Sequence, residues 1–184
     1  FPSASTKAES VLDLKEFLTI VKQAPELIIY LDLKIQAPLT VPAEQYGQSI
    51  FALWQQFAMP NPLYIEGPNT EAIQAFDRYG VENVTTVLSY PPFWANKNAI
   101  LTGIAATIGA YIQPQKALKK ALKAHANAVA SPTSVANKRL RKNLKQHGKA
   151  IIVFTPNTFK AIAKVCASGV DILITDHPTL GPCR

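Results

Sequence analysis

The sequence predicts an α/β fold built on a parallel sheet, and two observations support this prediction. Short apolar segments rich in β-branched residues alternate with segments of helical period over most of the 184 residues. Polar or charged residues recur where these strands end, which is where parallel α/β folds build their sites. No glycine-rich phosphate loop follows any strand, so a Rossmann or P-loop interpretation is weak.

Six strands are expected, near residues 27–34, 62–66, 84–89, 126–130, 149–155 and 170–175. The first lies in the stretch ELIIYLDLK and ends with Asp32 and Lys34, two residues apart. Burying either charge without a partner is unfavourable by several kcal/mol, so this pair calls for an explanation. The other strand ends carry Glu66, Ser89, Ser131, Thr155 with Asn157, and Asp176.

Amphipathic helices are expected between the strands. Their ranges are 8–23, 47–59, 69–80, 114–126, 134–148 and 157–169. Asn69 can cap the third helix and Gly80 can end it, Gly148 closes the fifth, and Asn157 or Thr158 caps the last. The stretch 99–112 fits a helix or a strand.

One domain covering residues 1–184 is expected, because no Pro-, Gly- or Ser-rich linker divides the chain. Hydrophobic residues make up 48%, and no apolar run reaches the roughly 18 residues of a membrane span. The chain starts at Phe1 and its one methionine is Met59, so we expect a processed, cut or trimmed N-terminus.

The two cysteines, Cys166 and Cys183, fit no metal-binding spacing. We favour two unrelated thiols, with a disulfide that ties down the C-terminal tail as the alternative. The cysteines leave the redox compartment open.

Charge is distributed unevenly along the chain. Residues 1–82 hold ten acidic and five basic residues, whereas residues 83–170 hold thirteen Lys or Arg and no acidic residue. Ten of the thirteen lie between Lys116 and Lys149. This pattern fits solvated helix faces, or a surface for acidic lipid or nucleic acid. The residues expected on that face are Lys116, Lys119, Lys120, Lys123, Arg139, Arg141, Lys142 and Lys145.

Three stretches together resemble the phospholipase-C-like phosphodiesterases, which include glycerophosphodiester phosphodiesterases and sphingomyelinases D. YLDLK at 30–34 resembles the third strand of that family, KAIIVFTPNT at 149–158 the seventh, and GVDILITDHP at 169–178 the eighth. The resemblance implies an α/β fold of the TIM-type (β/α) barrel, with the first two strands lacking in this chain. It also implies cleavage or transesterification of a phosphodiester or phospholipid substrate.

Carried over by position, the resemblance makes Asp32 a ligand of a divalent cation, Mg²⁺ or Ca²⁺, and Lys34 the contact to a phosphate oxygen. It places Phe154, Asn157, Asp176 and His177 at the substrate. The chemistry of the residues agrees, because a hard cation prefers oxygen ligands and a lysine two residues along faces the same side of a strand. An internal salt bridge or a solvated strand end is the structural alternative.

The departures from the family pattern concern catalysis. The two histidines and the Glu-x-Asp metal pair of the family belong to strands one and two, which precede the region matched here. Phe154 stands where a tryptophan is usual, and His177 where a tyrosine is usual. His125 and His147 lie on basic helices, where a capping role is the simpler interpretation for His147.

We therefore expect a metal-dependent phosphodiesterase that is incomplete, and inactive, as residues 1–184 alone. Its missing strands would lie on a preceding segment or a second chain. The rival hypothesis is a catalytically inactive barrel that binds anionic lipid or, as the less favoured partner, nucleic acid through residues 116–149. We favour a secreted or membrane-peripheral location.

Overall fold

Six parallel strands form one sheet in the computed structural model of the chain, which describes residues 13–33, 41–68, 70–78, 83–90, 108 and 115–180. The strands are β1 (Ile29–Asp32), β2 (Leu63–Gly67), β3 (Val84–Ser89), β4 (Ala128–Pro132), β5 (Ala150–Phe154) and β6 (Ile172–Leu173). Each strand pairs in parallel with the next along the chain, which gives the order β1-β2-β3-β4-β5-β6. The six predicted strands and the parallel sheet are confirmed.

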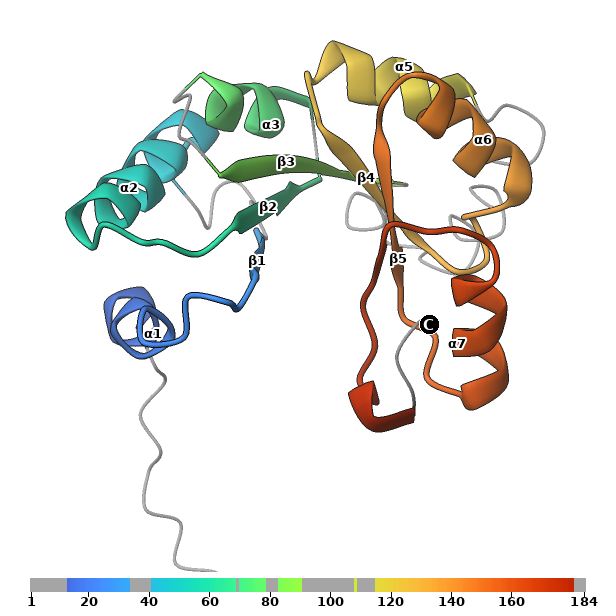
Figure 1. The fold of residues 1–184 in the computed structure, drawn as a ribbon. Coiled ribbons are helices and arrows are strands. Elements are labelled where there is room, and N and C mark those ends of the chain that lie inside the picture. Colours follow the sequence, from blue (N-terminus) through green and yellow to red (C-terminus); the bar gives the residue numbers. More distant parts are fainter. Residues whose placement is uncertain are drawn as a thin grey trace, which may run out of the picture.

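Helices connect the strands and cover one face of the sheet, which curls into a half-barrel (Figure 1). This arrangement confirms the predicted TIM-type α/β architecture with six strands. The helices are α1 (Leu14–Val21), α2 (Ala43–Gln56), α3 (Thr70–Asp77), α5 (Gln115–Lys123), α6 (Lys138–Gln146) and α7 (Phe159–Cys166), with a 3-10 turn, η2, at Pro178–Leu180.

Local side-chain and backbone chemistry defines several helix ends, and the predicted cap at Thr158 and stop at Gly148 are among them. Thr158 caps α7 by accepting a hydrogen bond from the backbone N–H of Ala161, and Asp13 forms a capping box with Glu16 at the start of α1. His147 follows the last residue of α6, and Gly148 adopts a left-handed conformation with φ of 64°, which ends the helix. The predicted roles of Asn69 and Gly80, and the stretch 99–112 apart from Ile108, lie outside the described residues.

The two faces of the sheet bury different sets of residues. Ile29, Ile65 and Val153 point to the outer face, where they join the large core formed with the helices. The intervening strand positions form a second, inner cluster. That cluster contains Val87, Ala128, Ala130 and Ile152, with Tyr30, Tyr64, Ala150, Phe154, Ile172 and Ile174 packed against it.

Strand alternation fixes where the strand-end side chains point. Because side chains alternate between faces, Asp32 shares the inner face with Tyr30, and Glu66 shares it with Tyr64. The carboxylates of β1 and β2 therefore lie inside the curl of the sheet, at its carboxyl end.

Cys166, at the end of α7, is disulfide-bonded. The favoured prediction of two unrelated thiols is therefore wrong for this residue. The other cysteine in the sequence, Cys183, lies outside the described residues. Among the helices that the structure describes, none has the length and apolar character needed to cross a membrane.

Candidate active site

Two carboxylates lie side by side at the carboxyl ends of β1 and β2. Asp32 is the last residue of β1 and is register partner to Glu66 of β2. Glu66 is 4% exposed, whereas Asp32 is exposed. Two like charges on neighbouring strands repel each other, and a cation beside such a pair would lower that repulsion.

Tyr30 connects the Glu66 carboxylate to the inner wall of the sheet. Its hydroxyl donates a hydrogen bond of 2.7 Å to Oε2 of Glu66, and its ring stacks on Tyr64 with ring centroids 6.1 Å apart. Burial raises the pKa of Tyr30 well above its ordinary value, and the negative charges of Glu66 and Asp32 raise this pKa further. Tyr30 is therefore a protonated donor that holds the Glu66 carboxylate in place.

The oxygen atoms of Asp32 and Glu66 are of the type that hard divalent cations bind. Mg²⁺ is usually bound by one or two carboxylates and keeps several waters or substrate phosphate oxygens, whereas Ca²⁺ takes six to eight oxygen ligands. Within the described part of the chain, no three His, Cys, Asp or Glu side chains gather as a metal site.

The ends of β5 and β6 form a second polar group built from Asn157, Thr175 and Asp176. Asn157 donates to Oδ2 of Asp176 at 2.5 Å, and its Oδ1 accepts from the backbone N–H of Asp176 at 3.0 Å. The hydroxyl of Thr175 donates to the carbonyl of Pro156 at 2.9 Å, and it lies 3.1 Å from Oδ1 of Asn157. These bonds tie the segment after β5 to the segment after β6.

Phe154 and His177 flank this second group. Phe154 ends β5 and packs on the inner cluster, as expected for an apolar wall. His177 is exposed, and its backbone N–H donates to Thr175 Oγ1 at 3.1 Å. Asp32, Asn157 and Asp176 thus lie at the same end of the sheet. Lys34, the predicted phosphate contact, lies outside the described residues.

Comparison with solved structures identifies the fold. A phosphodiesterase from Oleispira antarctica, in complex with the product sn-glycerol-3-phosphate, superimposes with a TM-score of 0.65 at 14% identity. A putative glycerophosphodiester phosphodiesterase from Galdieria sulphuraria gives 0.65 at 13%, and one from Silicibacter pomeroyi gives 0.64 at 17%. The matches cover 90%, 90% and 91% of this chain.

The chain has the fold of the glycerophosphodiester phosphodiesterases. The predicted resemblance is confirmed at the level of this phosphodiesterase fold. The chain spans 57%, 60% and 53% of the lengths of those three structures, in the order given. Comparison with protein-family models gives no match, and neither does comparison with curated proteins.

The two other histidines, His125 and His147, make local contacts away from the carboxyl end of the sheet. Nδ1 of His147 lies 2.9 Å from the carbonyl of Asn143, one turn back in α6. Nδ1 of His125, which follows α5 in a left-handed conformation, lies 3.3 Å from Oδ2 of Asp77. Among the described residues, His177 is therefore the histidine placed at the carboxyl end of the sheet.

The predicted basic residues lie on α5 and α6, two helices that contact each other. The four lysines of α5, at 116, 119, 120 and 123, are exposed, and Lys120 lies 5.8 Å above the ring of Tyr90. Arg139 and Lys142 are exposed on α6, and Lys145 lies 3.6 Å from Asp171. Arg141 differs from the others, because its guanidinium is partly buried beside Ala136.

The sequence analysis missed Glu66 and Tyr30 as members of the site. Glu66 stands at a strand end in the sequence, but its position in the sequence alone predicts no role for it. The signal that could have found it is the strand YIEG, in which Glu66 stands two residues after Tyr64 and so faces inward with it. Asp32 and Glu66 then share a face if the two strands pair in this register.

Proposed function

We propose that this chain is the C-terminal part of a metal-dependent phosphodiesterase barrel that acts on glycerophosphodiesters or phospholipids. The observation that carries the proposal is the pair of inward carboxylates, Asp32 and Glu66, on adjacent strands at the carboxyl end of a sheet with this fold. Active sites of (β/α) barrels lie at this end of the strands. The product-bound Oleispira antarctica structure supports a glycerol phosphate ester as the substrate class.

Each residue has a defined task in this proposal. Asp32 and Glu66 would hold Mg²⁺, and Tyr30 orients Glu66 through its hydroxyl. Lys34, two residues after Asp32, would bind a phosphate oxygen. The bound cation would supply charge stabilisation for the phosphoryl group. Phe154 would form an apolar wall beside the substrate, and Asn157, Asp176 and His177 would line the opposite rim.

The proton transfers need two groups, and His177 is the one histidine that the described residues place at the carboxyl end of the sheet. Cleavage of a phosphodiester requires a proton acceptor and a proton donor on opposite sides of the phosphorus. In the part of the chain that the structure describes, His125 pairs with Asp77 and His147 contacts Asn143, so neither is placed for this work. We propose that the acceptor and donor come from a segment that precedes residue 1 or from a second chain.

Measuring product release tests this proposal. Choline or glycerol phosphate release would be followed for residues 1–184 and for a longer chain that includes the preceding segment of the gene product. We expect no turnover by residues 1–184 and Mg²⁺-dependent turnover by the longer chain. Full turnover by residues 1–184 would show that the catalytic groups are placed wrongly, and no turnover by either would favour the binding function below.

A second candidate function is binding of an anionic membrane surface by α5 and α6. The observation that favours it is the exposed lysine face of α5 beside the basic α6, with acidic residues absent from both helices. Vesicle co-sedimentation at rising salt tests it, because an electrostatic contact weakens as salt is added. Binding that ignores salt contradicts the proposal, and preference for nucleic acid would replace lipid as the partner.

We also propose a secreted or membrane-peripheral location. The disulfide at Cys166 supports it, because disulfides persist in oxidising compartments and are rare in the cytosol. Electrophoresis of protein from its native source, with and without reductant, tests this. A fully reduced Cys166 in that material would contradict it.

A further inference from the structure

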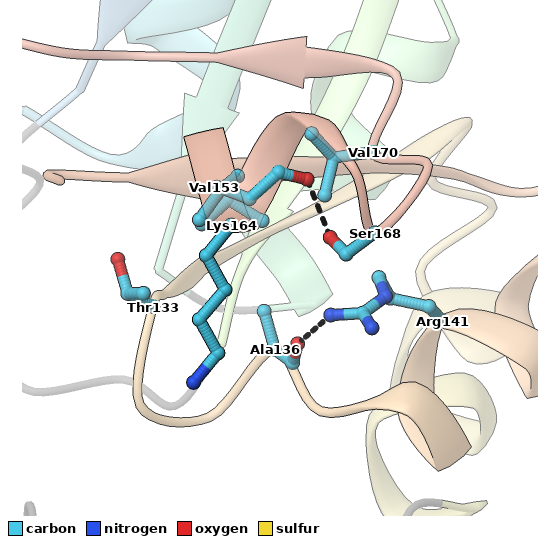
Figure 2. A pocket seen from close by; sticks show the side chains of 8 residues that line it. Thr133, Ala136, Arg141, Val153, Lys164, Ser168 and Val170 are labelled. Atoms are coloured by element: carbon cyan, nitrogen blue, oxygen red, sulfur yellow. Dashed lines mark hydrogen bonds between the residues drawn. The ribbon is translucent and has the colours of Figure 1, made fainter. Parts of the chain in front are cut away.

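A cavity of about 110 Å³ lies between α6 and α7, on the outer side of β5. Its apolar floor includes Val153 and Val165, which belong to the outer core, so the sheet separates this cavity from Asp32 and Glu66. We call it the α6–α7 groove. It is lined by Thr133, Ala136, Arg141, Val153, Lys164, Val165, Ser168 and Val170 (Figure 2).

Arg141 brings a partly buried positive charge to the groove. Its Nη1 donates a hydrogen bond to the carbonyl of Ala136, and burial lowers the pKa of the guanidinium. No carboxylate contacts Arg141 within the described residues, whereas Lys145, one turn further along α6, lies 3.6 Å from Asp171. A partly desolvated guanidinium without a counter-charge is stabilised by an anion, and one hydrogen bond leaves it further N–H donors.

Lys164 brings a second positive charge from α7. Figure 2 shows the Arg141 guanidinium and the stem of Lys164 on either side of Ala136. The lysine is exposed and has no acidic partner in the described part of the chain. The hydroxyl of Thr133 lies 3.4 Å from the carbonyl of Phe154, which is a long contact, so it can turn to donate elsewhere. No acidic side chain lines the groove.

We propose that the α6–α7 groove binds a tetrahedral oxyanion, either free phosphate or the phosphate group of an acidic lipid. The planar fork of Arg141 matches two oxygens of such a group, and the charge of Lys164 across Ala136 adds to the positive potential of the groove. The volume is well above the roughly 10–15 Å³ that one water needs, but below the about 300 Å³ of typical small-molecule pockets. It therefore suits one anionic group. The proposal does not depend on the phosphodiesterase activity, because the two sites lie on opposite faces of the sheet.

The test uses residues 1–184 and a matched pair of double variants. Arg141→Gln/Lys164→Gln removes two charges from the groove. Lys138→Gln/Lys160→Gln removes two charges from exposed positions on the same two helices. Inorganic phosphate is titrated at constant ionic strength with chloride as the balancing anion, and binding is followed by backbone amide NMR shifts and by calorimetry.

We expect phosphate to shift the amides of residues 133–136 and 165–170 in the wild-type chain. The groove variant should bind phosphate about tenfold more weakly or worse, and the control variant should bind it within about a factor of two of wild type. Equal affinity of the two double variants would overturn the proposal. The proposal would also be overturned if phosphate shifted only amides outside residues 133–136 and 165–170 in the wild-type chain. That result can be obtained even if the groove variant does not fold.

A second arm distinguishes the two sources of the oxyanion. Vesicles of phosphatidylcholine with phosphatidic acid are compared with vesicles of phosphatidylcholine alone. If the groove carries a lipid phosphate, the groove variant loses more binding to the acidic vesicles than the control variant does. If both variants bind the phosphatidic acid vesicles equally, and the groove variant still binds inorganic phosphate more weakly than the control variant, the ligand of the groove is free phosphate.

Discussion

The two halves of the carboxyl end of the sheet carry carboxylates that are held in different ways. At β5 and β6, Asp176 accepts a hydrogen bond from Asn157, which also bonds the backbone of Asp176, so this half is a network closed within the chain. At β1 and β2, Asp32 and Glu66 stand as register partners with Tyr30 between them and the core. Carboxylates at the same end of one sheet thus bond a neighbouring segment in one half, and in the other half they are the proposed ligands of a cation.

This difference distinguishes a carboxylate that stabilises the fold from one that is a candidate ligand of a cation. A carboxylate whose hydrogen bonds are made to a neighbouring loop stabilises that loop, and its negative charge is offset there. Asp32 and Glu66 stand instead on adjacent strands and face the same side of the sheet, where the hydroxyl of Tyr30 holds Glu66. Substitutions at the ends of β1 and β2 should therefore affect turnover and metal binding, whereas substitutions at the ends of β5 and β6 should affect stability.

The largest expected effect is on turnover in the longer chain. Asp32→Asn should reduce phosphodiester turnover by about 10²-fold or more, because it removes a charged ligand of the cation that would stabilise the reacting phosphate. Asp176→Asn keeps an oxygen that can accept from Asn157 and should reduce turnover by less than about tenfold. Comparable losses in both variants would remove the distinction between the two halves.

Metal affinity should show the next largest effect. Glu66→Gln should weaken Mg²⁺ binding by residues 1–184 by about 10-fold or more. Mutation of a residue that only hydrogen-bonds a metal ligand weakens metal binding by about 10- to 100-fold, and loss of the charge of a ligand itself should have at least that effect. Glu71→Gln removes the same charge from an exposed position on α3 and serves as the control. Calorimetric titration at fixed ionic strength measures both. Equal affinities would show that Glu66 does not face the cation.

Stability should depend more on the other half. Asn157→Ala removes the side chain that bonds both the carboxylate and the backbone of Asp176, and it should lower the free energy of unfolding by about 1–3 kcal/mol. Urea denaturation of residues 1–184 measures this, with Thr155→Ala, an exposed position in the same segment, as the control. An unchanged midpoint for Asn157→Ala would mean that this network does not hold the segments together.

The smallest effect concerns alkaline pH. Because the pKa of Tyr30 in the folded chain lies above the ordinary value of about 10, the protonated phenol favours the folded state. Its contribution is complete below about pH 10 and is lost as the pH rises beyond that value. Tyr30→Phe should therefore make the unfolding midpoint less sensitive to pH above about 10 than Tyr46→Phe on α2 does. The same sensitivity in both variants would contradict this.

The sequence is sufficient to predict the six strands and the helix signals at Thr158 and Gly148, because these signals are local, whereas α2 begins at Ala43 and not at the expected residue 47. Apolar β-branched runs, Thr158 as a cap and Gly148 as a stop each act through neighbouring residues, so they can be predicted without the tertiary structure. Asp32 could be placed at a strand end for the same reason. The pairing of Asp32 with Glu66 across β1 and β2 could not be predicted, because it depends on the register between two strands that a helix separates in the sequence.

The α6–α7 groove shows a second limit of sequence reasoning. Arg141 appears in the sequence as one of several basic residues on α6, equivalent to Arg139 or Lys142. In the structure it alone of these three turns toward α7 and is partly buried. Which face of a helix packs against a neighbour depends on the tertiary contact, and that contact decides whether a cation is solvated or lines a cavity.

Paramagnetic Mn²⁺ added to residues 1–184 tests the central claim most directly, because Mn²⁺ accepts the oxygen ligands that bind Mg²⁺. Amide signals near the ion broaden, so the measurement locates the ion without any need for turnover. We predict selective broadening at residues 31–33 and 65–67, competed by Mg²⁺ and lost in Asp32→Asn. Broadening centred on residues 175–177 instead, or unchanged in Asp32→Asn, would contradict the assignment of the cation to the carboxylates of β1 and β2.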